Sequence, residues 1–311
     1  MSPAPSTSFD HPALLYRDAG EYLAGTLPFI QAGLAAGEPV LVAVPHANLE
    51  LLRDGLGDDA GQVLLRDMGE AGRNPGRILP GVLLAFAAAY PDQPVRVIGE
   101  PVWAGRTPLE YPACVQHEAL INTAFADRHG AILCPYDVGR LAPEVVDDAY
   151  RTHPIVATAA GRETSRFYDD PTLVAARFNQ PLAVPPFGAA TMTVDGGSLA
   201  AVRQLVAARG VAAGLDALRI ADFTVAVNEL ATNSVKHGGG AGTLALWTED
   251  GALVAQVSDG GHIANPLAGR VPPPLDSANG GRGLVLVNQL CDLVRVHTTP
   301  DGTTIRALLY L

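Results

Sequence analysis

Hydrophobic and polar positions follow two different patterns along this chain of 311 residues. In residues 1–180, segments with helical periodicity alternate with short, continuous apolar runs such as the one at 39–44. Such runs are typical of strands buried on both faces, and the regular alternation favours a mostly parallel sheet. We predict helices at 19–36, 49–56, 79–90, 112–128 and 143–150, and strands at 39–44, 62–66, 95–98 and 131–136.

The second half, residues 188–311, has helices first and strands later. A predicted strand at 189–194 precedes helices at 198–213 and 215–237, and a hairpin of strands 243–248 and 253–258 turns at Asp250-Gly251. A glycine- and proline-rich loop at 260–281, a helix at 284–290 and strands at 293–298 and 303–310 complete the chain. This order predicts a two-layer α/β sandwich.

A proline-rich segment at 181–187 separates the two patterns. Because it has neither helical nor strand periodicity, we predict a linker there, between a domain at 1–180 and a second domain at 188–311.

Composition and charge narrow the function classes. With 21 basic and 32 acidic residues, the net charge of −11 disfavours direct binding to nucleic acid. No apolar run is long enough to span a membrane, the first residues do not form a secretion signal, and three cysteines suit a reducing compartment. We therefore expect a cytoplasmic protein. The only lysine, Lys236, is followed by His237, which excludes a Walker A phosphate loop.

Polar residues at the predicted strand ends of the first half indicate a pocket. Ligands of parallel sheets bind beyond the carboxyl ends of strands, and two positions on the helix at 112–128 share a face at i,i+4 spacing. The predicted lining consists of Glu100, Trp103, Glu118, Asn122, Tyr136 and Asp137. The alternative interpretation is that these residues cap helices and cover the core.

A metal centre is not favoured in the first half. Its histidines and cysteines, including His117, His129, His153, Cys114 and Cys134, lack the close pairings that are typical of zinc sites.

Several segments of the first half resemble one family. They are FDHPALLY at 9–16, GLAAGEPVLVAV at 33–44, RVIGEPVWAGR at 96–106, QHEALIN at 116–122 and LCPYD at 133–137. The similarity is to MEDS domains, the sensory domains of methanogen, methylotroph and DcmR regulators. It implies a domain with a RecA/KaiC-like sheet. Such a domain does not hydrolyse nucleotides and senses a small molecule.

Three polar clusters mark the second half. Glu229, Asn233 and His237 succeed one another at i,i+4 and therefore lie on one stripe of a helix. The sequence DGG at 259–261 ends a strand, and GGRGL at 280–284 opens a helix, where exposed N–H groups favour phosphate. Each cluster alone is typical of a solvated face, a turn or a flexible connection, but their order and spacing together indicate a nucleotide site.

The set resembles the GHKL ATPase superfamily and, within it, RsbW-like anti-sigma factors and serine kinases. Residues 229–237 are similar to the N box, 259–261 to the G1 box, 281–284 to the G2 box, and 302–305 to the closing strand. The resemblance implies that ATP and Mg²⁺ are the cofactors. The protein has no histidine in the helix at 198–213, which disfavours a complete sensor histidine kinase.

The resemblance also implies residue roles. Asn233 would bind Mg²⁺, Asp259 would accept a hydrogen bond from adenine, and Glu229 would be the catalytic base. Thr304 would face the adenine, and Arg282 would pair with phosphate charge. The other implied cofactor-binding positions are Gly261, Gly281 and Gly283.

One position departs from the family pattern. Ile263 replaces the second glycine of the G1 box, and the lid at 260–281 is short and rich in proline. The departure bears on lid closure and turnover more than on ATP binding.

The two resemblances together are typical of anti-sigma factors of the actinobacterial RsbA family. They imply a signal-responsive regulator of transcription that binds a sigma factor or phosphorylates a STAS anti-anti-sigma protein on serine or threonine. Homodimer formation, common among RsbW-like proteins, is a further option. Two alternatives stay open: a non-catalytic, nucleotide-dependent binding module, and a small-molecule enzyme built around Glu100, Glu118 and Asp137.

Overall fold

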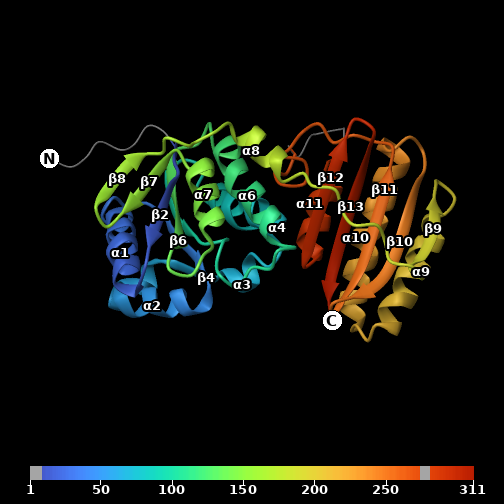
Figure 1. Ribbon diagram of the computed structural model, residues 1–311. Coiled ribbons are helices and arrows are strands. Elements are labelled where there is room, and N and C mark those ends of the chain that lie inside the picture. The colour runs from blue at the N-terminus through green and yellow to red at the C-terminus, as the bar shows by residue number, and fades with distance from the viewer. Residues whose placement is uncertain (1–8, 274–280) are drawn as a thin grey trace. The chain divides into compact units, whose positions relative to one another are not determined.

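The computed structural model describes residues 9–273 and 281–311 (Figure 1). The chain forms two compact units. The first comprises the residues up to Arg73 and Gly81–Phe178, and the second comprises Asn74–Pro80 and Asn179–Leu311. Within the described ranges, no helix has the length and apolar character needed to cross a membrane.

An eight-stranded sheet forms the centre of the first unit. Its strand order is β4-β3-β5-β6-β2-β7-β8, β1 pairs with β6, and the pairs are parallel except for β7 with β8. This confirms the predicted mostly parallel sheet. The strands are β1 (Phe9–Asp10), β2 (Pro12–Tyr16), β3 (Val40–Val44), β4 (Leu64–Asp67), β5 (Val95–Gly99), β6 (Gly130–Asp137), β7 (Ile155–Thr158) and β8 (Gly161–Thr164).

The helices of the first unit form two groups. α1 packs against α2, and α6 packs against α7 and α8; Figure 1 shows the two groups on either side of the strands. The elements are α1 (Ala19–Ala35), α2 (His46–Leu56), η1 (Gly57–Gln62), α3 (Met68–Ala71), α5 (Leu84–Ala89), α6 (Tyr111–Ala124), α7 (Pro143–Thr152) and α8 (Pro171–Arg177).

The predicted helix at 79–90 is interrupted. The chain instead forms α4 (Pro75–Ile78), a π-helical turn η2 (Leu79–Leu83) and α5. Pro80 lies in this stretch; it has no N–H to donate and its ring crowds the preceding turn, so the regular α-helical ladder cannot continue.

The central strand β2 is not among the strands predicted from the sequence. It pairs with β6 on one side and β7 on the other, and all five of its residues are buried. Pro12 is tolerated because it is the first residue of the strand. β2 begins directly after His11 and ends at Tyr16, so these two residues lie at opposite edges of the sheet's middle.

The second unit is a two-layer sandwich, as predicted. Its sheet has the order β12-β13-β11-β10-β9 with every pair antiparallel. Apolar residues of three helices pack on one face of this sheet to form a single core. The elements are β9 (Ala190–Val194), α9 (Leu199–Ala212), α10 (Ala217–His237), β10 (Gly242–Glu249), β11 (Ala252–Asp259), α11 (Gly283–Leu290), β12 (Leu293–Thr299) and β13 (Gly302–Tyr310).

Local signals fix the position of α10 and the hairpin that follows it. The side chain of Asp216 caps α10 by accepting a hydrogen bond from the N–H of Arg219 at 2.9 Å. Asp250 and Gly251 both have positive φ, +48° and +72°, as the tight turn between β10 and β11 requires. The end of α10 meets the end of β11, where the N–H of Gly260 donates a hydrogen bond to the carbonyl oxygen of Gly238 at 3.2 Å.

Candidate functional site

A pocket of about 640 Å³ opens beside α10 in the second unit. Its walls come from the last two turns of α10, the end of β11, the start of β13, the segment after β11 and the start of α11. Five of the predicted site residues line it: Asn233, Asp259, Gly261, Gly281 and Gly283. Glu229, Arg282 and Thr304 are not among its lining residues.

Gly283 at the start of α11 brings the helix close to the polar stripe of α10. A Cβ atom at Gly283 would lie 2.8 Å from Glu229 Oε2 and 3.5 Å from Asn233 Nδ2. A side chain at this position would therefore crowd Glu229 and touch Asn233 at ordinary contact distance. Glu229 and Asn233 therefore both lie next to the start of α11, and Glu229 stands at the side of the pocket.

Asp259 is held in a fixed orientation at the end of β11. Its Oδ2 accepts a hydrogen bond from Ser234 Oγ at 2.5 Å, and its Oδ1 accepts one from the N–H of Gly261 at 2.8 Å. A Cβ atom at Gly238 would come within 2.4 Å of the Asp259 side chain, and one at Gly261 within 2.6 Å of the carbonyl oxygen of His237. The glycines at both positions are therefore required for this close approach. Neither Ser234 nor Gly238 is among the site residues predicted from the sequence.

The N-terminus of α11 presents backbone donors near the pocket. Gly281 has a φ of +85°, a conformation that favours glycine, and the N-cap residue Arg282 forms no side-chain capping bond. The first N–H groups of a helix have no partner within the helix and favour anions. Gly281 and Gly283 thus shape a surface suited to phosphate. Residues 274–280 of the predicted lid lie outside the described residues.

Thr303, rather than the predicted Thr304, lines the pocket. In the antiparallel ladder Thr303 lies opposite Asp259, whereas Thr304 lies opposite Ser258 and shares a hydrogen bond with its hydroxyl at 3.0 Å. Neighbouring strand residues point to opposite faces, so only one of the two threonines can face the pocket. Thr303 also donates a hydrogen bond to the carbonyl oxygen of Gly261 at 2.8 Å.

Ile263 forms part of the pocket wall. Its N–H donates a hydrogen bond to Thr298 Oγ1 at 2.9 Å, and its side chain packs against the core. The residue that departs from the G1 pattern is therefore anchored at the beginning of the lid segment.

A second, smaller pocket of about 190 Å³ lies in the first unit, at the carboxyl ends of β2, β3, β5 and β6. Glu100, Trp103 and Asp137 line it, as does Tyr16. Glu100 is almost completely buried, and its carboxylate accepts hydrogen bonds from Tyr16 Oη at 3.2 Å and from Asn48 Nδ2 at 2.8 Å. Burial raises the pKa of Glu100 to about 8, although these hydrogen bonds oppose the change.

Comparison with known families assigns both units. Residues 10–154 match the MEDS family, the methanogen/methylotroph, DcmR sensory domain, and residues 192–309 match the histidine kinase-like ATPase domain family. The chain therefore contains a MEDS domain at residues 10–154 and a histidine kinase-like ATPase domain at residues 192–309.

Curated proteins give no match to the chain. A solved structure with similarity to it contains the RsbU and RsbW domains of Rv1364c from Mycobacterium tuberculosis. The identity is 23%, the similarity covers 40% of this chain and 33% of that chain, and the TM-score is 0.31.

The six residues predicted to line one pocket of the MEDS domain occupy different places. Glu100, Trp103 and Asp137 surround the small pocket, whereas Glu118 and Asn122 lie in a buried cluster with His11. The i,i+4 spacing on α6 correctly gave them a common face, but that face packs inside the domain. Tyr136 is also buried and its ring packs edge-on against that of His153.

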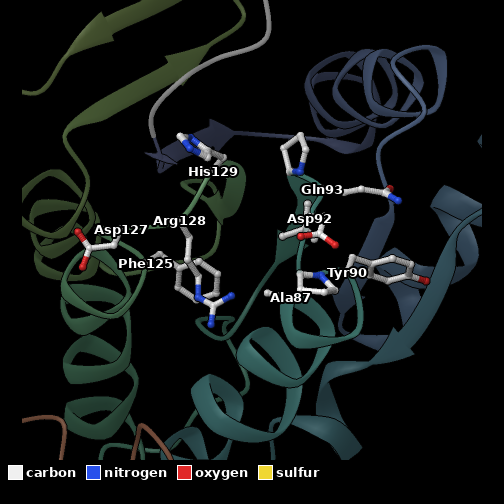
Figure 2. Close-up of a pocket in the computed structure, with 11 residues that line it drawn as sticks. Ala87, Tyr90, Asp92, Gln93, Phe125, Asp127, Arg128 and His129 are labelled. Carbon is white, nitrogen blue, oxygen red and sulfur yellow. The ribbon is translucent and has the colours of Figure 1, made fainter. Parts of the chain in front are cut away.

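A groove of about 640 Å³ lies at the opposite end of the MEDS sheet. Figure 2 shows Arg128 and His129 facing Asp92 and Gln93 across it. This groove lies at the amino ends of β5 and β6, where parallel sheets do not usually bind ligands. The small pocket at the carboxyl ends is therefore the better candidate for a ligand of the MEDS domain.

Proposed function

We propose that this protein is an ATP-dependent, partner-switching regulator of transcription. Its ATPase domain would bind Mg²⁺ and ATP and either hold a sigma factor or phosphorylate a STAS-type anti-anti-sigma protein on serine or threonine. The observation that carries the proposal is the convergence of Asn233, Asp259 and the glycine-bordered start of α11 on one pocket. The family match of residues 192–309 supports it.

The pocket fits a nucleotide in size and in the chemistry of its walls. Its volume lies within the range of roughly 300–1,000 Å³ that is usual for small-molecule sites. Asp259 offers a fixed carboxylate to an exocyclic amine, and the start of α11 offers N–H groups to phosphates. Asn233 would hold Mg²⁺ through its amide oxygen. Bound Mg²⁺ and ATP would supply a transferable phosphoryl group.

Glu229 is the proposed base. Its carboxylate lies beside Gly283, at the helix start where the phosphates would bind. From there it could accept the proton of a serine or threonine hydroxyl whose oxygen attacks the γ-phosphate of ATP, with ADP as the leaving group. Arg282 is exposed at the same helix start, where it could pair with phosphate or with an acidic partner.

Ile263 favours a second candidate function. A branched side chain anchored to the core restricts the first residues of the lid segment. In this alternative, nucleotide would set the shape of a partner-binding surface without turnover. The MEDS domain would supply the signal in both cases, through a small molecule bound beside Glu100 and Trp103.

Calorimetric titration with Mg²⁺ and ATP is the first test. We expect the wild type to bind, Asn233→Ala to bind at least about tenfold more weakly, and the control Asn228→Ala to bind like the wild type. Asn228 lies on the same helix but hydrogen-bonds Arg203 at 2.9 Å, outside the pocket. The proposed site would be contradicted if the wild type did not bind ATP, or if Asn233→Ala bound ATP as tightly as the control Asn228→Ala.

Phosphate transfer separates the two candidate functions. With a STAS-type partner and labelled ATP, the kinase predicts transfer that Glu229→Ala abolishes while ATP binding is retained. Binding without transfer to any such partner would favour the non-catalytic module, whereas transfer by Glu229→Ala at the wild-type rate would exclude Glu229 as the base.

A further inference from the structure

Four potential metal ligands meet inside the MEDS domain. His11 precedes β2, Glu118 lies on α6, Cys134 lies on β6, and His153 follows α7. Their ligand atoms all lie within 4.8 Å of one another, and each residue is at most 1% exposed. We refer to these four residues as the His-Glu-Cys cluster.

Hydrogen bonds outside the cluster determine how the two imidazole rings are protonated. Asn122 donates from Nδ2 to the carbonyl oxygen of Thr152 at 2.8 Å, so its Oδ1 is the atom that faces His11 Nδ1, at 3.0 Å. His153 Nδ1 lies 2.9 Å from the carbonyl oxygen of Ala149, which can only accept. Both Nδ1 atoms therefore carry a proton, and each ring, when neutral, directs an Nε2 lone pair into the cluster.

The centre of the cluster consequently contains acceptors that face one another. Glu118 Oε2 lies 3.4 Å from His11 Nε2 and 3.3 Å from His153 Nε2. Both carboxylate oxygens of Glu118, and Nε2 of His153, are buried without a hydrogen-bond partner. The thiol of Cys134, 3.4 Å from His11 Nε2, can supply a single proton. Buried acceptors in this arrangement need either a shared proton on an imidazole ring or a bound cation.

Three of the six separations between ligand atoms are those of a four-coordinate metal shell, and the remaining pairs lie within 4.8 Å. Zinc binds nitrogen, oxygen and sulfur at roughly 2.0–2.3 Å in a tetrahedron, which places neighbouring ligand atoms about 3.3–3.7 Å apart. The three separations of 3.3, 3.4 and 3.4 Å fall in this range. The Nδ1–H bonds to Asn122 and Ala149 are the outer-shell contacts that orient metal-bound histidines.

We propose that the His-Glu-Cys cluster is a closed binding site for a divalent transition metal, with zinc as the best-fitting ion. A thiolate, a carboxylate and two neutral imidazoles around a divalent ion have no net charge, which suits complete burial. Thiolate and imidazole ligands select zinc over magnesium and calcium. With four protein ligands no position is left for substrate, so the ion ties β2, α6, β6 and the start of β7 together.

Metal analysis of the full-length protein under reducing conditions tests the site. We expect about one zinc per chain in the wild type after incubation with Zn²⁺ and desalting, and close to none in Cys134→Ser. The matched control is Cys114→Ser, which replaces another buried cysteine of the same domain and keeps the zinc. Glu118→Gln retains the side-chain size but loses the charge, and we expect at least tenfold weaker binding in competition with a chromophoric chelator.

Cobalt substitution of the wild type keeps the test independent of whether the variants fold. Co²⁺ bound to one thiolate in a tetrahedral site gives intense visible bands and a sulfur-to-metal charge-transfer band, both of which added Zn²⁺ should remove. A wild type that takes up neither Zn²⁺ nor Co²⁺ would overturn the proposal and leave the cluster as a buried proton-sharing group. An octahedral cobalt spectrum without charge transfer would also overturn it, since Cys134 would then not be a ligand.

Discussion

The nucleotide pocket of the ATPase domain and the His-Glu-Cys cluster of the MEDS domain show two ways of building a polar site. The pocket draws on short motifs at element ends, and several of its residues are glycines whose backbone approaches neighbouring groups. The cluster draws single residues from four elements and closes completely. An open pocket with backbone donors suits a ligand that exchanges, whereas a closed set of side chains suits an ion that stays.

Removing a metal from the cluster should have the largest effect. Metal binding contributes directly to folding free energy in closed sites, so treatment with a strong chelator should lower the Tm of the MEDS domain by about 10 °C or more. The chain has two tryptophans, Trp103 in the MEDS domain and Trp247 in the ATPase domain. Variants that retain only one, through Trp247→Phe or Trp103→Phe, would report each domain by fluorescence.

The ATPase transition serves as the internal control for that experiment, because it should not respond to the chelator. If the Tm of the MEDS domain were the same with and without chelator, the comparison would fail, because the cluster would then hold no ion that stabilises the domain.

Glu100 tests what burial does to a carboxyl group whose partners are neutral. Its pKa of about 8 means that between pH 4.5 and about 8 the folded chain keeps a proton that the unfolded chain has lost. The unfolding free energy of the MEDS domain should therefore fall as pH rises through this window, by about 4 kcal/mol. Denaturant titrations at several pH values should show this decline in the wild type and a much flatter profile in Glu100→Gln.

Glu163→Gln is the matched control, because Glu163 is exposed on β8. Its variant should follow the wild-type profile. A decline of the same size in Glu100→Gln would assign the pH dependence to another group.

Asp259→Asn tests the nucleotide pocket at a carboxylate that two hydrogen bonds hold in place. The substitution removes a fixed charged acceptor that two donors hold in place, and we expect ATP binding to weaken by about 3 kcal/mol, or about 100-fold. Asp250→Asn is the control, because asparagine tolerates the positive φ of this exposed turn. Calorimetry measures both variants, and equal affinities would remove Asp259 from the site.

The two neighbouring threonines of β13 provide the finest test. Thr303→Val should weaken ATP binding by about 1 kcal/mol, since it removes a hydroxyl from the pocket wall and its bond to Gly261. Thr304→Val should leave the affinity unchanged, because Thr304 pairs with Ser258 on the other face of the sheet. The reverse order of effects in the same titration would show that the closing strand presents the other threonine to the nucleotide.

The sequence determined most of the ATPase domain on its own. Glu229 and Asn233 are on one helix, so the periodicity of 3.6 residues places them on one stripe whatever the rest of the fold does. The other motifs lie where a strand ends and where a helix begins, and turn residues such as Asp250 and Gly251 fix the hairpin locally. Local geometry was sufficient to predict these elements and their order.

Tertiary structure decided which side chains meet. The choice between Thr303 and Thr304 depends on the register of β13 against β11, because a shift by one residue reverses the faces of a strand. The six residues assigned to one MEDS pocket divide between two places because the common face of Glu118 and Asn122 packs inside the domain.

The His-Glu-Cys cluster left no local signal, since its members stand at positions 11, 118, 134 and 153. It forms because β2, a short strand beginning with a proline, inserts between β6 and β7. That pairing joins residues more than a hundred positions apart. Sequence periodicity reports the side-chain directions within one element, whereas the meeting of elements depends on burying a shared core, which only the folded chain accomplishes.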